Sequence, residues 1–189
     1  MNNKDKQRFS KFLSLILRHK PEEVGLTLMD NGWVNIDRLI NAINSSAKSD
    51  YKIDRQLIEE IVAEDNKQRY SISEDGELIR ANQGHSIKGL NMEFKEVTDA
   101  PLYLYHGTSV DNFEKIKASG SIRAMSRQMV HLSGDVETAT KVGKRHGKLC
   151  ILYIDTYKLT SSGHRILISE NGVYLVDEVP LDCVIKIEK

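Results

Sequence analysis

Residues 10–21, SKFLSLILRHKP, constrain the fold most, because they join a helical apolar stripe to a proline that must end it. The stripe recurs at helical spacing and consists of Phe9, Phe12, Leu13, Ile16 and Leu17. At 100° per residue, Arg18 points away from this stripe and His19 lies at its edge. Pro21 ends the helix, because the residue before a proline avoids helical geometry. The pattern predicts an Arg–His pair in the last helical turn, which by itself also fits two ordinary surface residues.

The charge balance limits the kind of partner the chain can bind. The chain carries 27 basic and 27 acidic side chains, so its net charge is zero and a nucleic-acid site needs a local basic patch. Cys150 and Cys183 lie in apolar runs and predict core positions, not a disulfide framework or a metal site. We find no signal peptide and no membrane-spanning apolar run, and we expect a cytoplasmic monomer.

Residues 1–92 are expected to form a small helical lobe that ends in a β-hairpin. Asn35 and Asp54 each precede a helical apolar pattern and have side chains that cap helices. Asp75 and Gly76 lie between two alternating runs, which is a strong signal for a hairpin turn. Helices followed by such a hairpin are typical of a winged-helix unit.

The predicted hairpin places its side chains on two faces. With the turn at residues 75–76, Ile72 lies opposite Ile79 on an apolar face. Arg69 and Arg80 then share the polar face. Hairpin arginines are more often simply solvated than functional, so this placement by itself assigns no role.

The second lobe, residues 93–189, is expected to be α+β with a small mixed or split sheet. We predict strands at residues 102–107, 129–133, 149–155, 173–176 and 183–187. One helix is expected from Thr108 or Ser109 to about Ala118, and another from Asp135 to Arg145.

The familiar nucleotide and metal motifs are missing from the sequence. It has no Gly-x-Gly-x-x-Gly, Walker, His-Glu-x-x-His or Gly-x-Ser-x-Gly pattern. His106 and His131 lie instead on predicted strands, where a histidine is more often structural than functional. Gly107 makes His106 the stronger candidate for ligand binding, because a glycine lets a ligand approach the backbone closely.

Six short segments of the sequence resemble the motifs of one known protein family. They are residues 17–21 (LRHKP), 67–70 (KQRY), 79–86 (IRANQGHS), 104–108 (LYHGT), 126–133 (SRQMVHLS) and 170–173 (ENGV). In this order they resemble the RNA 2′-phosphotransferase family, also called Tpt1 or KptA, over nearly the whole chain.

The resemblance implies a winged-helix RNA-binding lobe at residues 1–92 and an NAD-binding, ADP-ribosyltransferase-like lobe at residues 93–189. The implied substrate is an RNA, such as a tRNA, with an internal 2′-phosphate left at a splice junction. That phosphate attacks the ribose carbon bearing nicotinamide and gives an ADP-ribosylated 2′-phospho-RNA. A neighbouring ribose hydroxyl then attacks the phosphorus, releasing 2′-OH RNA and ADP-ribose 1″,2″-cyclic phosphate. NAD is consumed as a co-substrate, and no metal is implied.

The resemblance also implies roles for individual residues. The family's essential residues correspond to Arg18, His19, Arg69 and Arg127. The implied NAD-binding residues are His106, Gly107, Thr108, His131 and Ser133, and the implied RNA-binding residues are Arg80, Gln83 and His85. Arginine forks suit phosphate oxygens, and a nucleophile that is already an anion needs positioning more than a base.

Two assignments within this set stay open. His19 can serve in proton transfer, since its ordinary pKa is near neutral, or bind phosphate only. Many relatives in the wider fold have a catalytic glutamate on a later strand, where this family has an aliphatic residue. We align Val179 with that position, and Glu178 is the alternative.

Two other functions compete with this interpretation. The same scaffold could transfer ADP-ribose to another acceptor, such as a terminal nucleic-acid phosphate or a protein side chain. A non-enzymatic winged-helix protein would instead bind nucleic acid without NAD and with strong salt dependence.

Overall fold

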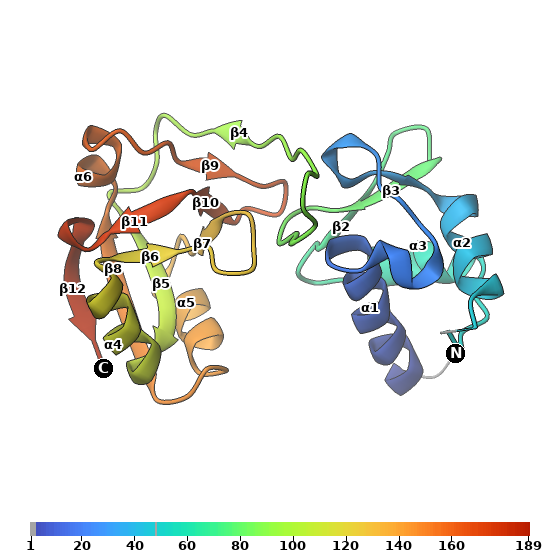
Figure 1. The fold of residues 1–189 in the computed structure, drawn as a ribbon, viewed down its shortest axis with the longest axis horizontal. Helices are drawn as coiled ribbons and strands as arrows, with labels where there is room; N and C mark the ends of the chain where they lie inside the picture. Colours follow the sequence, from blue (N-terminus) through green and yellow to red (C-terminus); the bar gives the residue numbers. More distant parts are fainter. Residues whose placement is uncertain (1–2, 48) are drawn as a thin grey trace. The chain divides into compact units, whose positions relative to one another are not determined.

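The computed structural model describes residues 3–47 and 49–189. The chain divides into two compact units, Met1–Glu93 and Phe94–Lys189. Each unit combines helices with antiparallel strands around a core of its own, so the protein is α+β, as predicted (Figure 1). In the described residues, no helix is long and apolar enough to cross a membrane.

In its described residues, unit 1 has three α-helices, two short 3-10 turns and a three-stranded sheet with the order β1-β3-β2. In chain order, the elements are α1 (Asn3–Arg18), 3-10 turns at Pro21–Val24 and Asp30–Gly32, β1 (Val34–Asn35), α2 (Ile36–Ser45), α3 (Arg55–Ala63), β2 (Tyr70–Ile72) and β3 (Leu78–Ala81). The predicted caps are confirmed, since Asn35 accepts from the Arg38 N–H at 3.0 Å and Asp54 from the Leu57 N–H at 2.9 Å.

The first helix is anchored as its pattern predicted. Phe9, Leu13, Ile16 and Leu17 are fully buried in the unit's core, whereas Phe12 is only partly buried. The helix ends at Arg18, and His19 lies in the turn before the buried Pro21.

The hairpin register is also confirmed. Ser71 lies opposite Arg80 and Ile72 opposite Ile79 in the pairing of β2 with β3. The hydroxyl of Tyr70 donates to the Ser10 carbonyl at 2.8 Å and so ties the hairpin to α1.

Unit 2 contains a three-stranded sheet β12-β8-β5, a four-stranded sheet β4-β9-β10-β7 and a pair β11-β6. Its strands are β4 (Lys95–Glu96), β5 (Tyr103–Ser109), β6 (Ser121–Arg123), β7 (Val130–Leu132), β8 (Leu149–Asp155), β9 (Leu167–Ile168), β10 (Tyr174–Val176), β11 (Glu178–Pro180) and β12 (Val184–Glu188). Its helices are α4 (Val110–Ser119), α5 (Val136–Gly143), α6 (Thr156–Ser161) and a 3-10 turn at Leu181–Cys183. Every pairing of these named strands is antiparallel, so the sheet is split and not mixed.

The helices of unit 2 decide between two predicted caps and correct one predicted helix end. Ser109, not Thr108, caps α4, because its hydroxyl accepts from the Asn112 N–H at 3.2 Å. Helix α5 ends at Gly143 and does not reach Arg145. A Cβ at Gly143 would lie 3.0 Å from the Thr108 backbone and 2.6 Å from the Leu149 side chain, so the end of this helix packs closely against β5 and β8.

Candidate functional site

In unit 1, the segment that follows β3, residues 82–86, packs against the C-terminal end of α1. A Cβ on Gly84 would lie 3.7 Å from the Arg18 guanidinium, so the backbone of this segment approaches that side chain closely. The N–H of Ser86 donates to the Arg18 carbonyl at 2.9 Å. Its hydroxyl lies 2.8 Å from Nδ1 of His19, which fixes the imidazole ring and leaves Nε2 on the other edge. The Arg18–His19 pair is therefore held by a segment about 65 positions away in sequence.

The same segment also holds the backbone around Arg69. Asn82 is 5% exposed, and its N–H donates to the Arg69 carbonyl at 2.8 Å. The Asn82 amide donates to the Gln68 carbonyl at 2.8 Å and accepts from the Ser71 hydroxyl at 2.7 Å. Gln68 has a φ of 45°, a left-handed conformation that these hydrogen bonds stabilise. Asn82 and Gly84, two positions apart, thus contact Arg69 and Arg18.

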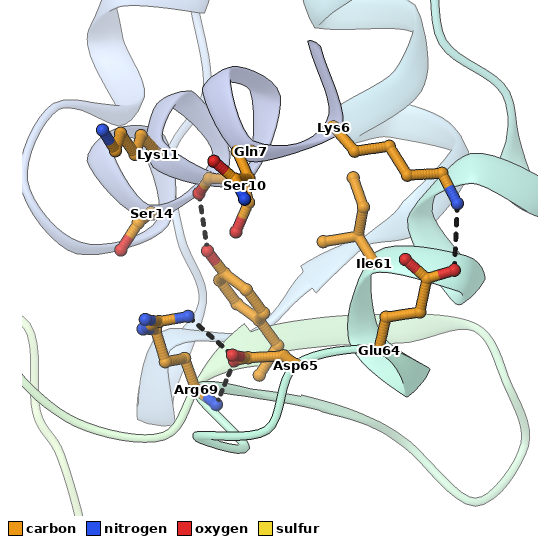
Figure 2. Close-up of a pocket in the computed structure, with 10 residues that line it drawn as sticks. Lys6, Gln7, Ser10, Lys11, Ser14, Ile61, Glu64, Asp65 and Arg69 are labelled. Atoms are coloured by element: carbon orange, nitrogen blue, oxygen red, sulfur yellow. Dashed lines mark hydrogen bonds and ion pairs between the residues drawn. The ribbon is translucent and has the colours of Figure 1, made fainter. Parts of the chain in front are cut away.

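Arg69 is oriented by a carboxylate that the sequence analysis did not single out. The Arg69 guanidinium donates to Oδ1 of Asp65 at 2.6 Å, and its backbone N–H donates to Oδ2 at 2.7 Å. The Asp65 side chain is 6% exposed and that of Arg69 is 33% exposed, so the carboxylate is buried and the arginine side chain stays partly exposed. Figure 2 shows the Arg69 guanidinium directed at the Asp65 carboxylate. The signal was weak, because the four-residue spacing falls after the end of α3 and so lacks a helical template.

The other implied RNA-binding residues lie in the same unit. Arg80 stacks on Trp33 with its guanidinium carbon 4.5 Å from the ring centroid, so it is not a freely solvated wing residue. Gln83 is half-buried beside Asn82.

His85 has the most perturbed environment of this set. It is 1% exposed, and neither ring nitrogen has a hydrogen-bond partner among the described residues. Burial, followed by the positive charges of Arg18, His19 and Arg80, lowers the pKa of His85 to about 4. The ring is therefore neutral at pH 7, with Nε2 directed at Gly32, where an added Cβ would lie 2.9 Å away.

In unit 2, β5 and β7 bring the two strand histidines together. Tyr105 and Ser133 exchange backbone hydrogen bonds of 2.9 and 2.8 Å, which extends the contact between these strands. Nδ1 of His106 lies 3.2 Å from the His131 carbonyl, and a carbonyl can only accept, so this nitrogen carries the proton. Burial lowers the pKa of His106, and the ring is neutral with Nε2 as an acceptor.

Arg127 joins this cluster from the loop between β6 and β7. Its guanidinium donates to Nδ1 of His131, which must therefore be unprotonated. The backbone N–H of Arg127 donates to the Ala124 carbonyl at 3.1 Å and closes a turn in this loop. Unit 2 thus gathers Arg127, His131, His106 and Ser133, four of its predicted site residues.

The reason we gave for Gly107 is wrong. A Cβ at Gly107 would lie 1.8 Å from the Ala139 carbonyl oxygen and 3.0 Å from the Gly143 nitrogen. The missing side chain therefore admits helix α5 and does not leave room for a ligand on that face. The neighbouring Thr108 is 4% exposed and pairs with Cys150 in β8.

Val179 and Glu178 lie on β11, which pairs with β6. The Val179 side chain is fully buried in the core. Glu178 accepts from the Ser121 hydroxyl and, at 3.2 Å, from Arg123. These two contacts, the hydroxyl first, lower the pKa of the Glu178 carboxyl. Its structural partners account for this carboxylate without a catalytic role.

Comparisons with known proteins cover nearly the whole chain. The model of the RNA 2′-phosphotransferase, Tpt1/KptA family matches residues 4–178. A protein of Fusobacterium nucleatum named probable RNA 2′-phosphotransferase is 50% identical over 174 residues, which cover 92% of this chain and 94% of the relative. A protein of the same name from Pseudomonas syringae is 41% identical, and the match covers 99% of this chain and 97% of the relative. Another from Rhodopirellula baltica is 46% identical and covers 90% of both chains.

Proposed function

Because the chain belongs to the RNA 2′-phosphotransferase, Tpt1/KptA family, we propose that it removes an internal 2′-phosphate from RNA in an NAD-dependent reaction. The observation that carries this proposal is the segment at residues 82–86, which contacts Arg18, His19 and the backbone of Arg69. This segment fixes the backbone at Arg18 and Arg69 and the ring of His19, so little reorganisation is needed when a dianionic phosphate binds.

We assign the phosphate-binding role to Arg18, His19 and Arg69 in unit 1 and to Arg127 in unit 2. A guanidinium can donate to two phosphate oxygens at once and keeps its charge at every working pH. The element order α1-β1-α2-α3-β2-β3, with the sheet order β1-β3-β2, supports a winged-helix assignment for unit 1. In this assignment, Arg80 on β3 and Gln83 in the segment at residues 82–86 serve RNA binding, and the buried His85 supports the segment from within.

The residues of unit 2 suit NAD. The neutral His106 offers Nε2 as an acceptor for a ribose hydroxyl, and His131 and Ser133 lie on the strand that contacts it. NAD, when bound, supplies the electrophilic ribose carbon and nicotinamide as the leaving group. The neutral state of His106 means that this ring adds no positive charge beside a cationic nicotinamide ring. The split antiparallel sheets support an ADP-ribosyltransferase-like assignment for this unit.

His19 is the group we assign to proton movement when the RNA 2′-oxygen is released. Its ring is held at Nδ1 by Ser86, so Nε2 is the nitrogen that can exchange a proton with substrate. The thiols of Cys150 and Cys183 are buried and free, and burial raises both pKa values, so we assign neither thiol a nucleophilic role.

The test uses a short RNA with a single internal 2′-phosphate, incubated with the protein with and without NAD. We expect NAD-dependent formation of 2′-OH RNA, nicotinamide and ADP-ribose cyclic phosphate, identified by mass. An RNA that stays ADP-ribosylated would contradict the second step. Unchanged RNA, with ADP-ribose transferred to another acceptor, would contradict the substrate assignment.

A further inference from the structure

We propose that a groove beside α1 binds the sugar-phosphate backbone of the RNA next to its 2′-phosphate. This inference rests on the proposed function and gives it an RNA-binding track. The groove has a volume of about 420 Å³ and lies along α1, facing the end of α3 and the start of β2 (Figure 2). Most residues that line it have a polar or charged group at the end of the side chain; they are Lys6, Gln7, Ser10, Lys11, Ser14, Ile61, Glu64, Asp65, Arg69 and Tyr70.

One face of α1 leads from this groove to the proposed phosphate site. Gln7, Lys11, Ser14 and Arg18 are spaced by four, three and four residues, so they lie in a row along the helix. Lys11 and Arg18 are seven residues apart, which is about 10 Å along the helix axis. A nucleic-acid strand carries one phosphate per about 3.4 Å when stacked. A strand that leaves Arg18 along this row must therefore bring another phosphate close to Lys11.

The groove contains Arg69 as well, so it meets the phosphate site at one end. Figure 2 shows the Arg69 guanidinium, Ser14 and Lys11 on one side of the groove, and Lys6 with Glu64 on the other. Ser14 is half-buried, and its hydroxyl can donate to a phosphate oxygen.

The charges give the track a direction. Lys6 is paired with Glu60 at 2.8 Å and with Glu64 at 3.0 Å, so the far end of the groove carries an excess of negative charge. Lys11 is exposed, and among the described residues no carboxylate lies within ion-pair distance of it. A phosphate is attracted to Lys11 and repelled beyond it, so the track accommodates a few nucleotides on one side of the 2′-phosphate.

The test compares two substrates that share the 2′-phosphate. One is a six-nucleotide RNA with a central 2′-phosphate, and the other is a nucleoside 2′-phosphate, which has no phosphodiester. We expect Lys11→Ala to raise KM for the RNA about tenfold at low salt and to leave kcat and the nucleoside reaction unchanged. Ser14→Ala should have the same selectivity and a smaller effect. Alanine at either position keeps the helix intact.

A binding measurement completes the test. Fluorescence anisotropy of the same RNA without NAD should show that Lys11→Ala lowers the slope of log affinity against log salt by about 0.7, the value for one single-strand phosphate contact. Arg8→Ala is the matched control, because it removes one exposed cation from the same helix outside the groove.

Three results would contradict the proposal that this groove binds the RNA backbone. They are an equal effect of Lys11→Ala on both substrates, an unchanged salt slope, and an equal effect of Arg8→Ala. Failure of the proposed function is a separate outcome, in which the unsubstituted protein converts neither substrate. The salt slope with RNA still decides the role of Lys11 in that case.

Discussion

The carboxylate of Asp65 binds Arg69 twice, through the guanidinium at 2.6 Å and through the backbone N–H at 2.7 Å. Because one buried carboxylate fixes both ends of the residue, the guanidinium has little freedom to reach other positions. Asp65 is a positioning residue in this arrangement, and it does not need to touch the substrate.

We expect Asp65→Asn to lower kcat/KM for 2′-phosphorylated RNA about tenfold, because an amide holds the guanidinium with a weaker hydrogen bond than a carboxylate. Steady-state kinetics and a thermal melt would measure activity and folding separately. Asp37→Asn breaks a more exposed ion pair, that with Arg55 at 3.0 Å, and should leave kcat/KM unchanged. A loss in both variants would remove the specific role of Asp65.

Ser86→Ala should lower kcat more than it raises KM. The substitution removes the hydrogen bond to Nδ1 of His19 but keeps the backbone hydrogen bond to the Arg18 carbonyl. The ring then rotates more freely, and we expect a loss of about threefold to tenfold in kcat with a shifted pH profile. A change in KM alone, with the pH profile intact, would contradict a proton-transfer role for His19.

His85 should make the protein less stable in acid. The pKa of His85 is about 4 when folded and near 6.5 when unfolded, so the unfolded chain binds the proton first as the pH falls. Stability is therefore lost between pH 6.5 and 4, at up to about 1.4 kcal/mol per pH unit and roughly 3 kcal/mol in total. Urea unfolding across this range would measure the loss.

His85→Leu is the companion variant. Leucine removes two buried nitrogens that have no hydrogen-bond partner among the described residues, so stability at pH 7 should be unchanged or higher. The acid limb of the stability curve should flatten. An unchanged acid limb would show that other groups, such as His106, dominate it, because burial lowers the pKa of His106 as well.

Glu178→Gln should keep activity within about twofold. Its carboxylate is used by Ser121 and Arg123 on the neighbouring strand, and the glutamine side chain can retain part of this network. Initial rates with 2′-phosphorylated RNA would compare the activity of this variant with that of the unsubstituted protein. A loss of a hundredfold or more, with an unchanged melting temperature, would identify Glu178 as the catalytic glutamate of the wider fold.

Local patterns in the sequence predicted much of unit 1. The hairpin register follows from a two-residue turn and an alternating pattern, and the caps at Asn35 and Asp54 need only the next few residues. In unit 2, the strands β4, β6, β9 and β11 and the helix α6 were missed. Strands β4 and β9 have two residues each, and their pairing joins Lys95 to Ile168, so only tertiary contacts stabilise them.

The hydrogen bonds that hold the candidate site could not be predicted from the sequence for the same reason. Asn82 binds Gln68 and Ser71 across more than ten positions, and Ser86 binds His19 across 67. Neither spacing belongs to a helical or strand repeat, so no periodic pattern marks these residues. The arginines and histidines could be singled out because their chemistry is distinctive, whereas their supporting residues are ordinary polar side chains.

The contact of Gly107 with Ala139 affects how mutational data on this protein should be interpreted. A scan that replaces each residue by alanine would report Gly107 as essential, next to a histidine assigned to the co-substrate. The defect would come from pushing α5 off β5, so it would appear as misfolded or insoluble protein and not as a raised KM for NAD. Expression level and melting temperature, measured beside activity, would separate a strand that must accept a helix from a strand that must accept a nucleotide.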